Sequence, residues 1–198
     1  MTSVRACAAL PFLAAVLVGG LATGAASPIA AQGVLDLRGR PVDPLTVSDG
    51  TRAHVLVFTT TDCPISNRYA PEIARLAAAY AARGVRFWVI YPVPGDTPEK
   101  IRTHATRFGL DLPIARDTRA ALVKRTGVSV TPEVAVIDGR GEVAYRGRVD
   151  DRYVDFGVDR PSPTTRDLDA ALTNLLAGQP IDPATTRAVG CILSDLLK

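Results

Sequence analysis

An apolar run that leads directly to a cysteine constrains the fold more than any other feature of this chain. Residues 55–58 read Val-Leu-Val-Phe between polar residues, which is typical of a central strand covered on both faces. After a short polar turn, Cys63 and Pro64 open a helical pattern that extends to about Arg83 and ends at Gly84. Unpaired N–H groups and the helix dipole at such a position favour thiolate over thiol. The sequence therefore predicts a reactive sulfur where a strand meets a helix.

The first 31 residues are predicted to be a secretory signal peptide and not part of the folded domain. Arg5 supplies their only charge, and an apolar run over 6–18 gives way to small residues. This pattern is typical of export with cleavage between residues 25 and 32, and the apolar core is short for a membrane span. We therefore expect an exported protein, periplasmic or secreted, that associates with a membrane only if the segment stays uncleaved. Cys7 would be lost with it.

The remaining residues, 32–198, suit one domain with a sizeable core. Without Arg5 the chain keeps 22 basic against 20 acidic residues, so its net charge is +2. The arginines are scattered and form no basic block, which argues against a nucleic-acid partner. Cys63 and Cys191 would remain after export, and no cysteine or histidine pair has the spacing of metal ligands. We expect no metal and no cofactor.

Strand and helix patterns alternate along the mature chain. Glycines end the helical patterns, and an Asp-Gly-Arg-Gly turn indicates a β-hairpin. The predicted elements are an irregular start or short hairpin over 34–45, strands over 55–60 and 85–91 separated by the helix to residue 83, helices over 97–108 and 119–126, hairpin strands over 133–137 and 143–146, and a helix over 167–177.

Three local matches in this order of elements resemble the thioredoxin superfamily. A hydrophobic strand leads to a Cys-Pro pair that opens a helix, and Val130-Thr131-Pro132 is similar to the cis-proline turn that faces the active cysteine. The hairpin around 138–141 is similar to the closing strands of the same fold. The resemblance implies an α/β thioredoxin fold, with a central mixed β-sheet flanked by helices and a C-terminal helix and tail. It places a redoxin domain with a C-terminal extension over 32–198.

The motif departs from two branches of that superfamily. Ser66 stands where a dithiol thioredoxin has its second cysteine, and Val57 replaces the buried acid. Thr60 fits the threonine of a peroxiredoxin, whereas Leu56 stands in the place of its proline. The sequence Asp-Cys-Pro-Ile-Ser-Asn most resembles exported bacterial redoxin-domain proteins of the AhpC/TSA-like and thioredoxin-like families.

The position of Cys63 and the resemblance together imply its chemistry. A thiolate there would attack a disulfide or a peroxide, and the helix start should lower its pKa below the ~8.5 of free cysteine. The neighbouring Asp62 carboxylate opposes that shift. Hydroxyls would hydrogen-bond the sulfur or a peroxide oxygen, and the cis-proline turn would offer its backbone to an extended substrate. The expected substrate-binding residues are Thr60, Pro64, Ser66, Thr131 and Pro132.

Cys191 lies beyond the last long helix, and three roles remain open for it. It is expected to act as a second catalytic residue that forms a reversible disulfide with Cys63. Alternatively it forms a structural or intermolecular disulfide, for which the loop to Cys63 would span 128 residues. As a third alternative it is a buried, inert thiol.

We therefore expect an enzyme, an exported thiol-dependent oxidoreductase that acts on disulfides through a CxxS-type site. Its partners would be a protein disulfide or thiol and an unidentified reductant. One alternative is a peroxiredoxin-like antioxidant peroxidase, for which a hydroperoxide is the substrate. An alternative of another class is a redox-inactive binding module that holds a partner segment at Pro132.

Two histidines and an acidic run are expected to be surface features. His54 precedes the first strong strand at the end opposite Cys63, and His104 falls within a polar helical pattern. The run that includes Asp150 and Asp151 mixes acidic residues with arginines, and such loops are usually solvated.

Overall fold

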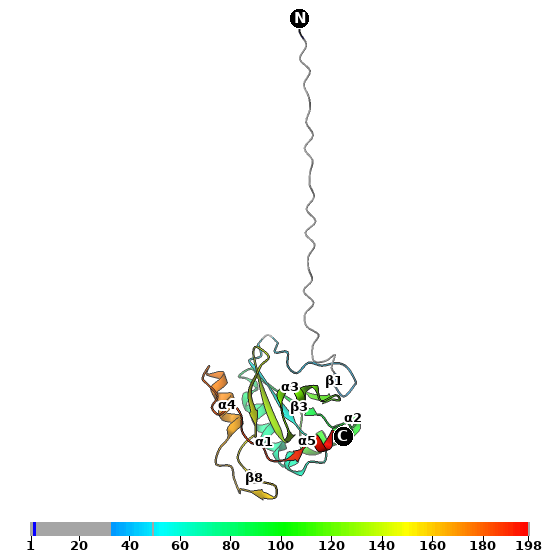
Figure 1. Cartoon of the computed structure of the whole chain (residues 1–198), viewed down its shortest axis with the longest axis vertical. Coiled ribbons are helices and arrows are strands. Elements are labelled where there is room, and N and C mark those ends of the chain that lie inside the picture. Colours follow the sequence, from blue (N-terminus) through cyan, green and yellow to red (C-terminus); the bar gives the residue numbers. More distant parts are fainter. Residues whose placement is uncertain (1, 3–32, 49, 198) are drawn as a thin grey trace.

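A six-stranded mixed β-sheet, in the order β1-β4-β3-β2-β6-β7, forms the centre of the computed structural model (Figure 1). The structure describes residue 2 and residues 33–48 and 50–197, so the predicted signal peptide lies, apart from residue 2, outside the described residues. None of the helices within the described part of the chain is long and apolar enough to cross a membrane.

The sheet strands are β1 (Val34–Leu35), β2 (Ala53–Phe58), β3 (Val85–Tyr91), β4 (Ile114–Asp117), β6 (Glu133–Asp138) and β7 (Val143–Gly147). Two further strand pairs are β5 (Val130–Thr131) with β10 (Cys191–Ile192), and β8 (Tyr153–Asp155) with β9 (Val158–Asp159). The helices are α1 (Pro64–Ala81), α2 (Pro98–Phe108), α3 (Ala121–Thr126), α4 (Asp167–Leu176) and α5 (Leu193–Leu196).

The sequence of β2 explains its place at the middle of the sheet. All six residues are buried, and the strand pairs in parallel with β3 and antiparallel with β6. Val55 and Val57 belong to the core that includes α1, α2 and α4, whereas Leu56 and Phe58 belong to the core that includes α3 and α5. Because β2 is held from both faces and both edges, its carboxyl end is a rigid support for the cysteine that follows.

The predicted α/β fold, with a mixed sheet flanked by helices and a C-terminal helix, is confirmed. At α2 the local signals are also confirmed, because the Thr97 hydroxyl accepts a hydrogen bond from the Lys100 N–H and Gly109 is left-handed. The strands β4, β5, β8, β9 and β10 and the helix α5 are not indicated by the sequence. Each has two to four residues, which is too few to show a periodicity.

The prediction that His54 lies at the surface is wrong. Its side chain is buried, the Nδ1 atom lies 2.7 Å from the Pro44 carbonyl oxygen, and the ring packs near Trp88. Burial lowers the pKa of His54, which favours the neutral imidazole near pH 7. The residue therefore ties the segment before β2 to the strand itself.

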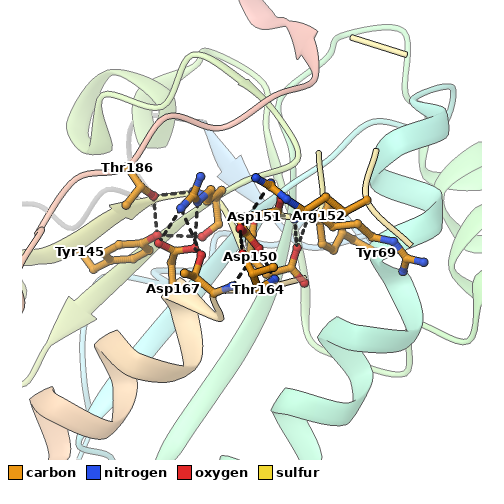
Figure 2. Close-up of polar contacts among 11 residues, drawn as sticks. Tyr69, Tyr145, Asp150, Asp151, Arg152, Thr164, Asp167 and Thr186 are labelled. Atoms are coloured by element: carbon orange, nitrogen blue, oxygen red, sulfur yellow. Dashed lines mark hydrogen bonds and ion pairs between the residues drawn. The ribbon is translucent and has the colours of Figure 1, made fainter. Parts of the chain in front are cut away.

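The prediction of a solvated acidic run is also wrong for Asp150 and Asp151, which are buried in the polar cluster of Figure 2. Asp150 accepts a hydrogen bond from the Tyr69 hydroxyl of α1 at 2.5 Å. Asp151 accepts the backbone N–H groups of Thr164 and Thr165 at 2.7 and 2.9 Å. The two carboxylates are buried because hydrogen-bond donors surround them, and they connect the segment after β7 to α1 and to the residues before α4.

We expect Asp151→Ala to lower the free energy of unfolding by about 1–2 kcal/mol, because it leaves several part-buried donors without their acceptor. Urea denaturation at pH 7 measures this. Asp155→Ala is the matched control, since Asp155 has a side chain 70% exposed and should change stability by no more than about 0.5 kcal/mol.

The same pair of variants tests a pH dependence. The Thr164 hydroxyl and the backbone N–H groups of Thr164 and Thr165 hold the pKa of Asp151 well below its usual range. Its contribution is therefore present above the ordinary value of 3.8 and is lost as the pH falls further. The stability difference between the wild type and Asp151→Ala should shrink in acid, and a difference that grew in acid would contradict this account.

Candidate functional site

Cys63 is the N-cap residue of α1, directly after the turn that leaves β2. Its backbone is extended (φ −85°, ψ 109°), Pro64 occupies the first turn of the helix, and the Asn67 N–H donates to the Cys63 carbonyl oxygen. The side chain is fully buried, whereas Pro64 is exposed. The chain therefore places the sulfur at the positive end of an 18-residue helix, as predicted.

The turn at Thr131-Pro132 faces this sulfur, and its peptide bond is cis, as the resemblance implies. The Cys63 thiol lies 3.0 Å from the Thr131 carbonyl oxygen, to which it donates. Both turn residues are buried. Two of the predicted substrate-binding residues are thus brought to the predicted nucleophile.

Glu133 holds this turn in place and is not indicated by the sequence. The carboxylate is buried and accepts the backbone N–H groups of Ser129 at 2.7 Å and Val130 at 3.3 Å. Arg146 of β7 lies 3.8 Å from its other oxygen. These contacts fix the backbone on the amino-terminal side of the cis bond, which positions the Thr131 carbonyl.

Cys191 reaches the site because β10 pairs with β5. The pairing is antiparallel and sets Cys191 opposite Thr131, so that the Cys191 Sγ lies 3.0 Å from the Cys63 Sγ. A covalent S–S bond is about 2.05 Å long, so the two thiols are free and in direct contact. Both predicted catalytic residues are thus brought together, although 128 residues separate them in the sequence.

The two thiols differ in acidity. Burial alone would raise the pKa of Cys63, but hydrogen bonding from the Cys191 thiol, from the Ser66 hydroxyl and N–H, and from the Thr131 hydroxyl lowers it below the ordinary value. Burial and the neighbouring Cys63 sulfur raise the pKa of Cys191 to about 12. Cys63 is therefore the thiol of the pair that ionises first, and its thiolate then accepts the S–H of Cys191 and no longer donates to Thr131.

The two remaining predicted residues, Thr60 and Ser66, also lie at the site. Thr60 lines a cavity of about 160 Å³ together with Cys63 and Cys191, and its carbonyl oxygen accepts the Cys63 N–H at 3.4 Å. The Ser66 hydroxyl is buried beside Cys63 and has no other hydrogen-bond partner within the described residues, so it is available to the Cys63 thiolate. The cavity is also lined by Asp62, Val93, Gly95, Asp96, Lys100 and Leu196.

Asp96 supports the turn before Cys63 and is a second residue that sequence reasoning misses. It accepts the Thr61 hydroxyl at 2.5 Å and the Thr61 N–H at 3.3 Å. Its place in a Pro-Gly-Asp-Thr loop indicates only a turn. The contact that gives it a role spans 35 residues and becomes visible in the fold alone.

The prediction that His104 lies at the surface is wrong. Its ring is buried between α1 and α2, with Nε2 2.6 Å from the Asn67 Oδ1 and Nδ1 2.8 Å from the Tyr91 hydroxyl. Burial lowers the pKa of His104, which favours the neutral ring near pH 7. The neutral ring satisfies both contacts when Nε2–H donates to Asn67 and Nδ1 accepts the Tyr91 hydroxyl. Within the residues that the structure describes, no three histidine, cysteine or acidic side chains gather where a metal ion could bind.

We expect Cys191→Ala to raise the pKa of Cys63, because the variant removes a hydrogen bond to the thiolate. The rate of iodoacetamide alkylation against pH measures this, with Cys63 identified by peptide mapping. Cys191→Ser keeps a donor and should give a smaller shift. An unchanged or lowered pKa in Cys191→Ala would show that Cys191 does not stabilise the thiolate.

Comparison with solved structures supports the thioredoxin-like fold. An uncharacterized conserved protein from Geobacillus kaustophilus is 26% identical over 81% of this chain and 86% of its own, with a TM-score of 0.68. A hypothetical protein from Sinorhizobium meliloti is 23% identical over 80% of this chain and 87% of its own, with a TM-score of 0.67. A thiol:disulfide interchange protein of the thioredoxin family from Chlorobium tepidum, 19% identical over 72% of this chain and 90% of its own, has a TM-score of 0.51 and shows likeness of fold alone.

The sequence itself matches a protein family over most of its length. None of the curated proteins compared with the chain matches it. Residues 30–159, which include β1 to β9 and Cys63 but not Cys191, match the Redoxin family. Family and fold together support thiol-dependent oxidoreduction as the kind of chemistry. The chain has a thioredoxin-like fold and belongs to the Redoxin family.

Proposed function

We propose that this protein is an exported thiol-disulfide oxidoreductase in which Cys63 is the nucleophile and Cys191 the resolving cysteine. The observation that carries the proposal is the 3.0 Å contact between the two sulfurs, with the lowered pKa on Cys63. A nucleophile with thiolate character beside a second thiol is the arrangement that disulfide exchange requires. Cys191 replaces, from the tail, the cysteine that is missing at Ser66.

The first step is attack of the Cys63 thiolate on one sulfur of a substrate disulfide. A Cys63–substrate S–S bond forms, the substrate S–S bond breaks, and the released substrate thiolate takes up a proton. The N-terminal end of α1, the Ser66 hydroxyl and the Cys191 S–H stabilise the attacking thiolate.

The second step is attack of Cys191, after it loses its proton, on the Cys63 sulfur of the mixed disulfide. The Cys63–Cys191 bond forms, and the second substrate sulfur leaves as a thiolate and takes up a proton. The substrate disulfide is then reduced to two thiols, and the protein dithiol is oxidised to a disulfide. A separate thiol reductant, of unidentified kind, returns Cys63 and Cys191 to the dithiol.

Export is part of this proposal and rests on the predicted signal peptide over 1–31. A periplasmic or secreted location supplies disulfides as substrates, because structural disulfides persist there. Disulfides of other exported proteins are therefore the proposed substrates.

We expect Cys63→Ser to lower the rate of reduction of a peptide disulfide by about 100-fold or more, since it removes the nucleophile. Cys191→Ser should stop after the first step and accumulate the mixed disulfide, which intact mass spectrometry detects as protein plus one half of the substrate. Stopped-flow mixing of the reduced protein with the peptide gives the rate of the first step.

Three outcomes would overturn this assignment. A peptide-reduction rate that Cys63→Ser leaves unchanged, or Cys191→Ser protein that forms no mixed disulfide, would favour a redox-inactive binding module. Oxidation of Cys63 by hydrogen peroxide many times faster than by the peptide would favour the peroxidase. The cavity beside Thr60 is the feature on which such a peroxide reaction would depend.

A further inference from the structure

We propose that the C-terminal tail, residues 188–197, is a built-in mimic of the substrate. On this proposal, which rests on the proposed function, protein substrates bind as a strand along β5 in place of β10. They carry glycine directly before the reacting cysteine, and they reach Cys63 only when the tail has left.

The tail is held at β5 as a bound peptide would be held. Cys191 and Ile192 pair antiparallel with Thr131 and Val130, and the Leu193 N–H donates to the Ser129 carbonyl oxygen at 2.9 Å. Backbone pairing with an exposed strand is a general mode of peptide recognition, in which side-chain pockets supply the specificity. The register places the tail sulfur against the Cys63 sulfur, which is the position that a substrate sulfur must take.

Only one large side chain of the tail is fully buried. Leu193 is buried and belongs to the core that includes Phe58 and Leu122. Ile192 is 54% exposed, and α5 is only four residues long. Val189, Cys191 and Leu197 are half-buried and pack at the edges of the two cores. A short segment with two ladder positions and one fully buried large side chain is the kind of element that opens without unfolding the rest of the domain.

The docked tail closes the site to polypeptides. The Cys63 side chain has no exposed surface in this state. The cavity beside it measures about 160 Å³ and is lined in part by Cys191 and Leu196 of the tail itself. That volume suits a small molecule, whereas a polypeptide disulfide needs the space that β10 fills. Departure of the tail must therefore precede attack on a protein substrate.

Gly190 of the tail lies so near the backbone of Thr131 that any side chain at this position would clash. A Cβ atom at Gly190 would overlap the Thr131 carbonyl oxygen and lie 2.6 Å from its carbonyl carbon. These are backbone atoms of the turn that Glu133 holds, so they cannot swing aside as a flexible side chain does. A peptide in the same register meets the same obstacle. Only glycine fits directly before its cysteine.

Replacement of the substrate strand by β10 would also drive the second reaction step toward product release. In the mixed disulfide the substrate strand occupies β5, and Cys191 can reach the Cys63 sulfur only as β10 pairs again with β5. Return of the tail therefore forms the Cys63–Cys191 bond and displaces the product strand in the same movement.

The test uses the full chain with Cys191→Ser, in which peptide mapping follows alkylation of Cys63 by a polymer-linked maleimide. We expect an added Gly190→Ala to raise this rate by about tenfold or more, because it forces the tail off β5. Gly139→Ala is the matched control, because its added Cβ would lie 3.7 Å from the nearest atom, and it should leave the rate unchanged. Equal rates with and without Gly190→Ala would overturn the gating role.

A binding measurement separates this inference from the proposed function, because it needs no redox reaction. The probe is a synthetic peptide with the sequence of residues 188–193 and serine in place of the cysteine, titrated calorimetrically into Cys191→Ser/Gly190→Ala. A second peptide, with alanine in place of the glycine, should bind about tenfold more weakly or not at all. Equal affinities would refute the glycine rule even if Cys63 proves to be a working nucleophile.

A deletion of residues 188–198 replaces Gly190→Ala if that substitution unfolds the protein. The deletion keeps the backbone pairing of the preceding segment with β7. There the Arg146 N–H donates to the Ala184 carbonyl oxygen, and the Thr186 N–H donates to the Arg146 carbonyl oxygen. Thermal unfolding confirms that the deletion variant is folded. Faster labelling of Cys63 and preference for the glycine peptide are again expected, and the absence of both would refute the proposal.

Discussion

The backbone of Thr131 is the constraint on which the rest of the site depends. Its carbonyl oxygen accepts the Cys63 thiol at 3.0 Å, and its strand position sets Cys191 opposite. One short segment thus fixes both sulfurs relative to each other. Glu133 keeps that segment in place through the N–H groups on its amino-terminal side, and the cis bond to Pro132 turns the chain into β6. A buried carboxylate that is not a reactive group therefore determines the geometry of the reactive ones.

Ser66 shows how the chain accommodates the loss of a local dithiol. A cysteine at that position would lie on the same helix as Cys63 and would need no other part of the fold. The second thiol comes instead from a tail 128 residues away and depends on a strand pairing of two residues. In the mechanism we propose, the tail leaves and returns as a unit, so access to Cys63 and resolution of its mixed disulfide involve the same movement. With the tail docked, the Cys63 sulfur is closed to polypeptide substrates.

The parts of the fold that the sequence predicts are those with local causes. The apolar run of β2, the proline after Cys63 and the glycine after α2 each act within a few residues, and each is found as predicted. His54 and His104 are predicted wrongly because their burial depends on partners elsewhere, Pro44 in one case and Tyr91 and Asn67 in the other. The sequence leaves the contact of Cys191 with Cys63 as one of three alternatives, because β5 and β10 are too short to show a pattern.

Disulfide mapping of the protein equilibrated with glutathione redox buffers tests the central claim most directly. The account predicts one two-electron transition, in which the monomer loses two hydrogens and a single peptide pair joins Cys63 to Cys191. Glutathione that remained attached to Cys63, disulfide-linked dimers, or two thiols that stayed reduced throughout would contradict it, because each would mean that the two sulfurs in contact are not a redox pair.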